Sequence, residues 1–328
     1  MANQPHGDET QIDVRRALPA TFNRVLITAG FLLYAVVLFF AASRWKLPSI
    51  GWRAVGFLAL AVVSEFIAKV FFALLFKDAL HRQGHDVTLK ASIYASLIGS
   101  AVARLLPAGG ALTPTAMAWA VRTEDDETAG AALRATMTSY GGLLLLTGVA
   151  LGWGASTGRH PLLFTGAVVV GVLLTGAGLF ILIGSRWLGA AISRLPERLR
   201  RHFGPTGDVG RITPREIALI VARIVLEATV LWAALRAFGI DLTPSQAMVA
   251  FGVSTVVGGL PASPGGIGLV EGGLVGVLAG LRFPTGLVVA PVLVYRIIDY
   301  WLAAGVGILA AGRMNRHSTV PERRRSTI

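Results

Sequence analysis

The 328-residue chain contains no cysteine, and this absence excludes several kinds of chemistry. Disulfide bonds, thiolate metal sites and cysteine nucleophiles are ruled out. The phosphate-binding loop of P-loop NTPases is also missing, so the chain does not hydrolyse ATP through that motif. His81 and His85 lie four residues apart, but Gly84 separates them and no third ligand is evident. We therefore predict no metal site and no cofactor.

Charged residues are scarce as well. They make up 15% of the chain, against 54% hydrophobic residues, which is too little polar material to cover soluble domains. The apolar residues gather in blocks of about 20, the length of a helix that crosses a bilayer. The 39 glycines fit this class, since small residues let helices in lipid approach closely. The sequence predicts an all-α, polytopic membrane protein, so the net charge of +12 does not indicate a nucleic-acid partner.

Uninterrupted apolar segments predict about six full membrane spans. These are residues 25–43, 52–76, 131–153, 161–184, 216–238 and 284–311. Two further apolar segments, 91–121 and 244–280, are interrupted by proline and glycine near their middles. Non-helical backbone at membrane depth survives only where protein or water satisfies its polar groups. We therefore predict that each of these two segments is a broken, re-entrant helix unit.

The basic residues outside the predicted spans fall mostly on one face of the membrane. That face includes both chain ends and the long basic loop 185–215. By the positive-inside rule this face is cytoplasmic. The predicted organisation is a cytoplasmic tail at 1–24, a transmembrane domain at 25–312 and a basic cytoplasmic tail at 313–328.

The two broken segments resemble each other in sequence. Leu106 is followed by Pro-Ala-Gly-Gly, and Leu260 is followed by Pro-Ala and, two residues later, by Gly-Gly. Three predicted full spans separate the two breaks. Because that number is odd, the breaks would enter from opposite sides of the membrane, which is the inverted-repeat arrangement of many transporters.

The second break contains a pattern that is typical of a helix start. Ser263 is a favoured N-cap residue, and Pro264 suits the first helical position. A helix beginning here would point the amides of Gly265 and Gly266 into the membrane interior, where they could bind phosphate or carboxylate. The alternative is a purely structural helix start, since an ordinary span uses the same device at Thr213.

Glycine recurs every four residues after this break, at positions 268, 272, 276 and 280. This spacing places the glycines on one helix face. The pattern predicts close packing of that face on a neighbouring helix, with a groove for a lipid chain as the alternative.

Placing one ionisable side chain at the centre of a membrane-spanning helix costs about 3 kcal/mol of free energy on insertion scales. Ionisable residues inside the apolar segments are therefore expected to be functional. Arg104, Arg134 and Glu271 have no opposite charge one helical turn away within the membrane, and they are the stronger candidates for a site. Three pairs of opposite charge are spaced to share a helix face and neutralise each other, so a structural role and a functional role are both open for them. These pairs are Glu65 with Lys69, Arg223 with Glu227, and Arg296 with Asp299.

The string from Gly259 to Gly268, with Glu271 beyond it and Arg296 in the next span, resembles the flippase-like family. This is the transmembrane domain of bacterial lysylphosphatidylglycerol synthases, also found as a stand-alone membrane protein, and the resemblance covers about 25–312. It implies movement of a polar lipid between leaflets of a bacterial cell membrane. In full-length members a soluble aminoacyl-transferase domain follows. This chain stops about 16 residues after its last predicted span, so we expect no synthase domain here and a separate lipid-modifying enzyme as a candidate partner.

The resulting hypothesis is a polar-lipid flippase, a transporter and not an enzyme, with the bilayer and a lipid bearing a phosphate-containing headgroup as its partners. The residues expected to bind the substrate are Arg104, Arg134, Ser263, Gly265, Gly266, Glu271 and Arg296. The residues expected to balance charge or to couple transport are Glu65, Lys69, Arg223, Glu227 and Asp299. The substrate could be an aminoacylated phospholipid, another anionic phospholipid or a polyprenyl-phosphate-linked sugar. The alternative functions are a small-anion transporter or channel, and a membrane scaffold or lipid-linked glycosyltransferase.

Overall fold

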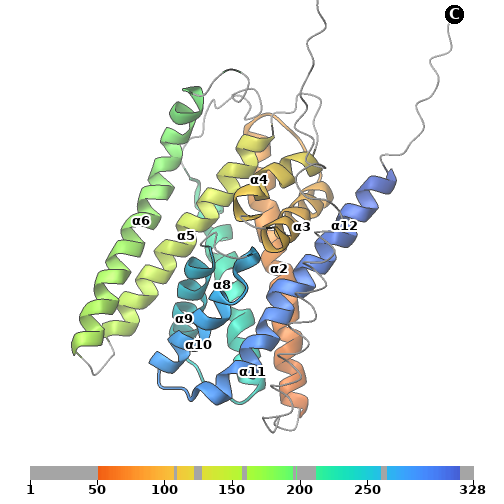
Figure 1. Ribbon diagram of the computed structural model, residues 1–328. Coiled ribbons are helices and arrows are strands. Elements are labelled where there is room, and N and C mark those ends of the chain that lie inside the picture. Colours follow the sequence, from red (N-terminus) through yellow and green to blue (C-terminus); the bar gives the residue numbers. More distant parts are fainter. Residues whose placement is uncertain are drawn as a thin grey trace, which may run out of the picture. The chain divides into compact units, whose positions relative to one another are not determined.

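The computed structural model describes residues 51–106, 109–121, 128–156, 161–194, 197, 212–259 and 264–317, all within one unit, Leu47–Ile328 (Figure 1). The regular structure of these residues is entirely helical. The predicted span 25–43, the predicted tail 1–24, about half of the basic loop 185–215 and most of the predicted tail 313–328 lie outside the described residues.

Long apolar helices account for five of the six predicted spans. They are α2 (Trp52–Arg82), α5 (Ala129–Ser156), α6 (Pro161–Ser193), α8 (Pro214–Ala237), and the run of α11 (Thr285–Arg296), η4 (Ile297–Leu302) and α12 (Ala303–His317). Each contains a stretch long and apolar enough to cross a membrane. The prediction of these five spans is confirmed.

Helices α2 and α8 pack against each other along the core. The start of α8 is fixed by a capping box: the Thr213 hydroxyl accepts from the Glu216 amide, and the Glu216 carboxylate accepts from the Thr213 amide. Phe76 and Leu80 of α2 and Leu231 of α8 are fully buried. These two helices therefore form a fixed scaffold on which charged side chains can be held.

The first broken segment forms a helical hairpin of α3 (Leu89–Leu105) and α4 (Gly109–Ala120). The chain folds back on itself, since the Thr113 hydroxyl donates to the Gly99 carbonyl across the hairpin at 3.5 Å. At the break, a Cβ on Gly109 would lie against the carbonyl oxygens of Val102 and Ala103, so that position needs glycine.

The second broken segment forms another hairpin, from α9 (Pro244–Gly258) through η3 (Pro264–Gly266) to α10 (Leu269–Gly280). Gly273 of α10 lies against Ser254 of α9. In the break, Gly265, Gly266 and Gly268 have φ of 54°, 70° and 85°, which is left-handed backbone that favours glycine. The structure confirms the predicted helix, break, helix form of both segments.

The breaks of the two hairpins meet. In Figure 1, α3 and α4 lie in the upper part of the unit and α9 and α10 in the lower part. The η3 turn contacts both α3 and α4. A Cβ on Gly265 would come within 2.6 Å of the Arg104 carbonyl oxygen, so the two tips are in close backbone contact.

The α-helix predicted to begin at Pro264 begins instead at Leu269. Residues Pro264–Gly266 form one 3-10 turn, and Gly268 is the N-cap of α10. The left-handed glycines prevent a right-handed helix from starting earlier. The Gly268 amide donates to the Glu271 carboxylate at 2.7 Å, so Glu271 occupies the N-terminus of α10 itself.

The glycine face of α10 does not pack as predicted. Among the described residues, a Cβ on Gly268, Gly272, Gly276 or Gly280 would meet no atom within 4 Å. The prediction that this glycine face packs closely on a neighbouring helix is therefore wrong for the helices that the structure describes. Helix α10 instead buries its other face, which carries Val270, Leu274 and Leu278. Close glycine packing occurs instead between α5 and α6, where Gly148 lies against Gly171.

Candidate functional site

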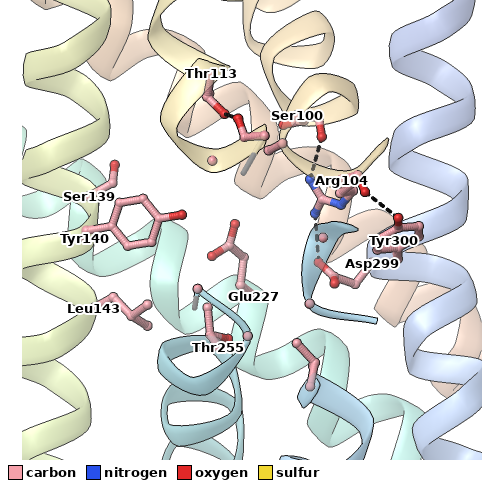
Figure 2. Close-up of a pocket in the computed structure, with 18 of the residues that line it drawn as sticks. Ser100, Arg104, Thr113, Ser139, Tyr140, Leu143, Glu227, Thr255, Asp299 and Tyr300 are labelled. Atoms are coloured by element: carbon pink, nitrogen blue, oxygen red, sulfur yellow. Dashed lines mark hydrogen bonds and ion pairs between the residues drawn. The ribbon is translucent and has the colours of Figure 1, made fainter. Parts of the chain in front are cut away.

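A cavity of about 480 Å³ lies where the two hairpin tips meet the long helices (Figure 2). Its volume is in the range of small-molecule sites, roughly 300–1,000 Å³. Both hairpins line it, together with α2, α5, α8, α11 and η4. Its charged lining residues are Lys69, Arg104, Arg223, Glu227, Arg296 and Asp299.

One face of α5 forms a hydroxyl-bearing wall. Thr136, Ser139, Tyr140 and Leu143 follow helical spacing and line the cavity. Figure 2 shows Tyr140 and Ser139 across the space from Arg104 and Asp299, with Glu227 between them. The Ser139 hydroxyl is buried and has no hydrogen-bond partner within the described part of the chain. Buried hydroxyls normally have partners, so this one is available to a ligand.

Arg104 lies in the last turn of α3, where a cation is favoured by the negative end of the helix dipole. Its guanidinium donates to the Ser100 carbonyl at 3.3 Å and to Asp299 Oδ1 at 3.0 Å. It also lies 3.8 Å from Glu65 Oε1. The Arg104 carbonyl accepts from the Tyr300 hydroxyl. The first tip is thus held to η4 by side chain and backbone together.

Arg296, at the end of α11, holds the second tip. It donates to Glu271 Oε1 at 2.8 Å, to Asp299 Oδ2 at 3.1 Å and to the Gly265 carbonyl at 3.1 Å. Its guanidinium also lies over the Tyr300 ring, 4.8 Å from the centroid. Only 4% of its side chain is exposed. A single arginine therefore connects α10, the η3 break and η4.

Asp299 joins the two tips. Each of its carboxylate oxygens accepts from a different arginine, Oδ1 from Arg104 and Oδ2 from Arg296. It lies in η4, a π-helical segment within an otherwise α-helical run. Such π-helical turns are rare and occur frequently at functional sites.

Lys69 of α2 also lines the cavity and contacts two carboxylates. Its Nζ lies 2.9 Å from Glu65 Oε1 and 3.2 Å from Glu227 Oε1. Arg223 also donates to Glu227, at 3.1 Å, and its guanidinium lies over the Phe72 ring. Helices α2 and α8 are thereby joined by charge as well as by apolar packing.

Together these contacts form one continuous ion-pair chain in which cations and anions alternate. In order, its members are Arg223, Glu227, Lys69, Glu65, Arg104, Asp299, Arg296 and Glu271. The chain has as many cations as anions, so its formal charge is zero when all are ionised. The three predicted helix-face pairs are confirmed, and contacts between helices link them into this chain.

The structure brings most of the predicted site residues together. The cavity is lined by Arg104, Gly265, Gly266 and Arg296. Glu271 and Glu65 do not line it, but each contacts a cation that does, Arg296 and Lys69 respectively. Ser263 lies outside the described residues.

Arg134 lies elsewhere. It is buried against Glu216, at 3.3 Å, near the start of α8, and it does not line the cavity. Its apolar sequence surroundings mark it as buried, but they do not reveal that its counter-ion is the capping glutamate of another helix.

The neutral polar residues Ser139, Tyr140, Thr255 and Tyr300 were not identified from the sequence, although they line the cavity. The helical spacing of hydroxyls on α5 was the one signal available for two of them.

Comparison with known proteins agrees with this architecture. The family described as "Lysylphosphatidylglycerol synthase TM region" matches residues 24–307, which include every residue of the cavity and of the ion-pair chain. A UPF0104 membrane protein of Methanothermobacter thermautotrophicus is 27% identical over 118 residues. That stretch covers 35% of this chain and 35% of that protein. The chain is a multi-pass membrane protein and belongs to the lysylphosphatidylglycerol synthase transmembrane-region family.

Proposed function

We propose that this protein moves a lipid with a phosphate-containing headgroup between the two leaflets, and that the headgroup passes through the cavity between the hairpin tips. The observation that carries the proposal is the cavity itself. Buried among spanning helices, it presents three arginines and a lysine: Lys69, Arg104, Arg223 and Arg296. Charged groups at membrane depth are costly and mark substrate pathways.

Phosphate suits this lining. Arginine guanidinium groups bind phosphate oxygens through two parallel hydrogen bonds, and a lysine adds a point charge. Each cation already contacts a carboxylate, so an entering phosphate would replace one anionic partner by another. Such an exchange favours reversible binding, which a transporter requires.

The walls of the site suit a lipid. The side chains of Leu112 of α4 and of Met137 and Tyr140 of α5 are each about two-fifths exposed. Leu112 and Met137 are apolar, so their exposed surfaces suit contact with hydrocarbon. They lie on the helices that flank the cavity. A headgroup could occupy the polar cavity while its hydrocarbon chains remain against these surfaces.

The two hairpins support a transport cycle. We propose that they are re-entrant units of an inverted repeat, each entering from one side with its tip near mid-membrane. Alternate opening on either side of the meeting point would expose the headgroup to each leaflet in turn. With both termini on the basic, cytoplasmic face, α3 and α4 would enter from the cytoplasm.

The substrate candidates all share the phosphate. An aminoacylated phospholipid is consistent with the name of the family, and a separate lipid-modifying enzyme would then supply it. Another anionic phospholipid or a polyprenyl-phosphate-linked sugar would present the same group to the arginines.

The test is lipid movement in vesicles that contain the purified full chain. Lipids labelled on an acyl chain, with phosphatidylglycerol, its aminoacylated form or a polyprenyl phosphate as headgroup, are followed by quenching of the outer leaflet. We expect transport of at least one of them, and loss of that transport in Arg104→Gln. Arg215→Gln is the matched control, because Arg215 is mostly exposed and pairs with Asp78 away from the cavity.

The same vesicles separate the other candidate functions. Phosphate or chloride flux without lipid movement would identify a small-anion transporter and end the lipid proposal. Absence of both activities in folded protein would point to a scaffold, and product formation from a lipid-linked sugar would point to a transferase.

A further inference from the structure

Glu65 is the most enclosed carboxylate of the ion-pair chain. Its side chain is 2% exposed. Neither of its oxygens has a hydrogen-bond partner of good geometry among the described residues. Its charge is offset by two cations, Lys69 at 2.9 Å and Arg104 at 3.8 Å. A buried carboxylate without hydrogen bonds depends strongly on such neighbours to remain ionised.

Both cations are exposed to the cavity, whereas Glu65 is not among its lining residues. Lys69 and Arg104 therefore contact Glu65 on one side and any ligand in the cavity on the other. The further charged and titratable groups near Glu65 are Glu227 of α8, Asp299 of η4 and Tyr295 of α11. None of these supplies a positive charge.

The two carboxylates that line the cavity, Glu227 and Asp299, are held more firmly than Glu65. Glu227 accepts two hydrogen bonds from Arg223, its neighbour on α8, and Asp299 accepts one from Arg296, its neighbour in the same helical run. The neighbour of Glu65 on its own helix is Lys69, and that lysine donates its hydrogen bond to Glu227. If an anion draws the cations toward the cavity, Glu65 loses the most stabilisation.

We propose that Glu65 is a proton-binding site coupled to the cargo, and that it takes up one proton when a phosphate-bearing headgroup enters the cavity. The phosphate attracts Lys69 and Arg104, and the carboxylate of Glu65 then gains a proton from water to form a neutral carboxylic acid. When the headgroup leaves, the two cations return and the proton is released to water. This inference rests on the proposed function, and it makes the protein a lipid and proton symporter.

The coupling fixes a direction. Headgroup and proton load together on the acidic side and are released together on the alkaline side. For one proton per lipid, a gradient of one pH unit sustains at most about a tenfold difference in lipid between leaflets. The lipid accumulates in the leaflet that faces the alkaline compartment.

The experiment uses the full chain in vesicles with an imposed pH gradient and a lipid that the protein has been shown to move. Wild-type protein should concentrate the labelled lipid severalfold in the leaflet facing the alkaline side, and a protonophore should abolish this. Glu65→Gln, a mimic of the protonated state, should still equilibrate the lipid but ignore the gradient. Glu216→Gln should respond to the gradient as wild type does, because Glu216 is also a buried carboxylate but lies outside the cavity, and glutamine can keep its capping box.

Calorimetry tests the coupling first on wild-type protein alone, and then tests its assignment to Glu65 with the variant. Binding of glycerophosphoglycerol to wild-type protein is measured in two buffers that differ in ionisation enthalpy. This headgroup analogue is a phosphodiester and does not itself titrate near neutral pH. We expect uptake of about one proton per bound headgroup analogue, and none in Glu65→Gln.

The outcomes are distinct. Lipid movement by wild type that ignores the pH gradient, with no proton uptake on binding, would overturn the coupling and leave the flippase proposal standing. Proton uptake that persists in folded Glu65→Gln would overturn the assignment to Glu65. Absence of any lipid movement by wild type would overturn the proposed function itself.

Discussion

Arg104 and Asp299 lie 195 residues apart in sequence and form an ion pair of 3.0 Å at the meeting point of the two hairpins. Arg104 belongs to the first hairpin, and Asp299 also binds Arg296, which holds the carbonyl of Gly265 in the second. The pair therefore links the tips of both hairpins. A rearrangement that separates the tips must break this contact or carry Asp299 with one of them.

Asp299→Asn should weaken this link. Asparagine keeps the size but removes the charge that both arginines share, and breaking a buried ion pair costs about 3–5 kcal/mol. We expect a clear fall in the melting temperature in detergent and at least a tenfold loss of lipid movement. Asp78→Asn is the control, since Asp78 pairs with the exposed Arg215. An Asp299→Asn protein that matches this control in both measurements would show that the link is dispensable.

Gly265→Ala should destabilise more than Gly268→Ala. Both glycines have left-handed φ, so both substitutions carry a backbone cost of roughly 1–2 kcal/mol. At Gly265 the new methyl group would also lie 2.6 Å from the Arg104 carbonyl oxygen, whereas Gly268 has open space among the described residues. Thermal unfolding of the two variants measures the difference. Equal melting temperatures would argue against close contact of the tips.

Arg134→Ala should affect stability more than transport. It leaves Glu216 with Arg82 as an ion-pair partner and leaves the cavity lining intact. We expect a loss of about 3 kcal/mol in unfolding free energy, with lipid movement per folded molecule close to wild type. Arg104→Ala should lower both stability and lipid movement, because Arg104 lines the cavity and also forms the buried ion pair with Asp299. If Arg134→Ala abolishes movement in protein that remains folded, the substrate path extends beyond the cavity.

Ser139→Ala should reduce lipid movement a few-fold with little change in stability. Its hydroxyl is buried at the cavity without a partner among the described residues, so removing it costs the folded protein less than about 1 kcal/mol. Ser92→Ala is the matched control, because the Ser92 hydroxyl is also buried and unpartnered there, but away from the cavity. Equal transport by the two variants would mean that the Ser139 hydroxyl does not bind the headgroup.

The sequence was informative wherever the deciding interactions were local. Apolar runs of bilayer length predicted the five long helices, and the proline and glycine clusters near Leu106 and Leu260 predicted the breaks. A spacing of four residues predicted the contacts of Lys69 with Glu65 and of Arg223 with Glu227, because helical geometry alone sets them.

The remaining features depend on tertiary structure. Arg134 pairs with a glutamate on another helix, and so does Lys69 when it contacts Glu227. Both contacts depend on helix packing, which no local sequence pattern encodes. The start of α10 was misjudged because Ser263 and Pro264 favour a helix start, whereas the left-handed backbone of Gly265 and the glycines after it delays the helix. Favourable capping chemistry was outweighed by backbone conformation.

The zero formal charge of the ion-pair chain bears on how membrane voltage acts on the protein. Each unbalanced elementary charge that crosses the membrane potential changes the energy by about 2.3 kcal/mol per 100 mV. The four cations and four anions of the ion-pair chain, from Arg223 at one end to Glu271 at the other, cancel. Movement of the whole ion-pair chain as one body in the unloaded protein therefore transfers no net charge across the membrane. Under the proposed function, the return step of the unloaded protein should thus proceed at the same rate in an energised and a de-energised cell.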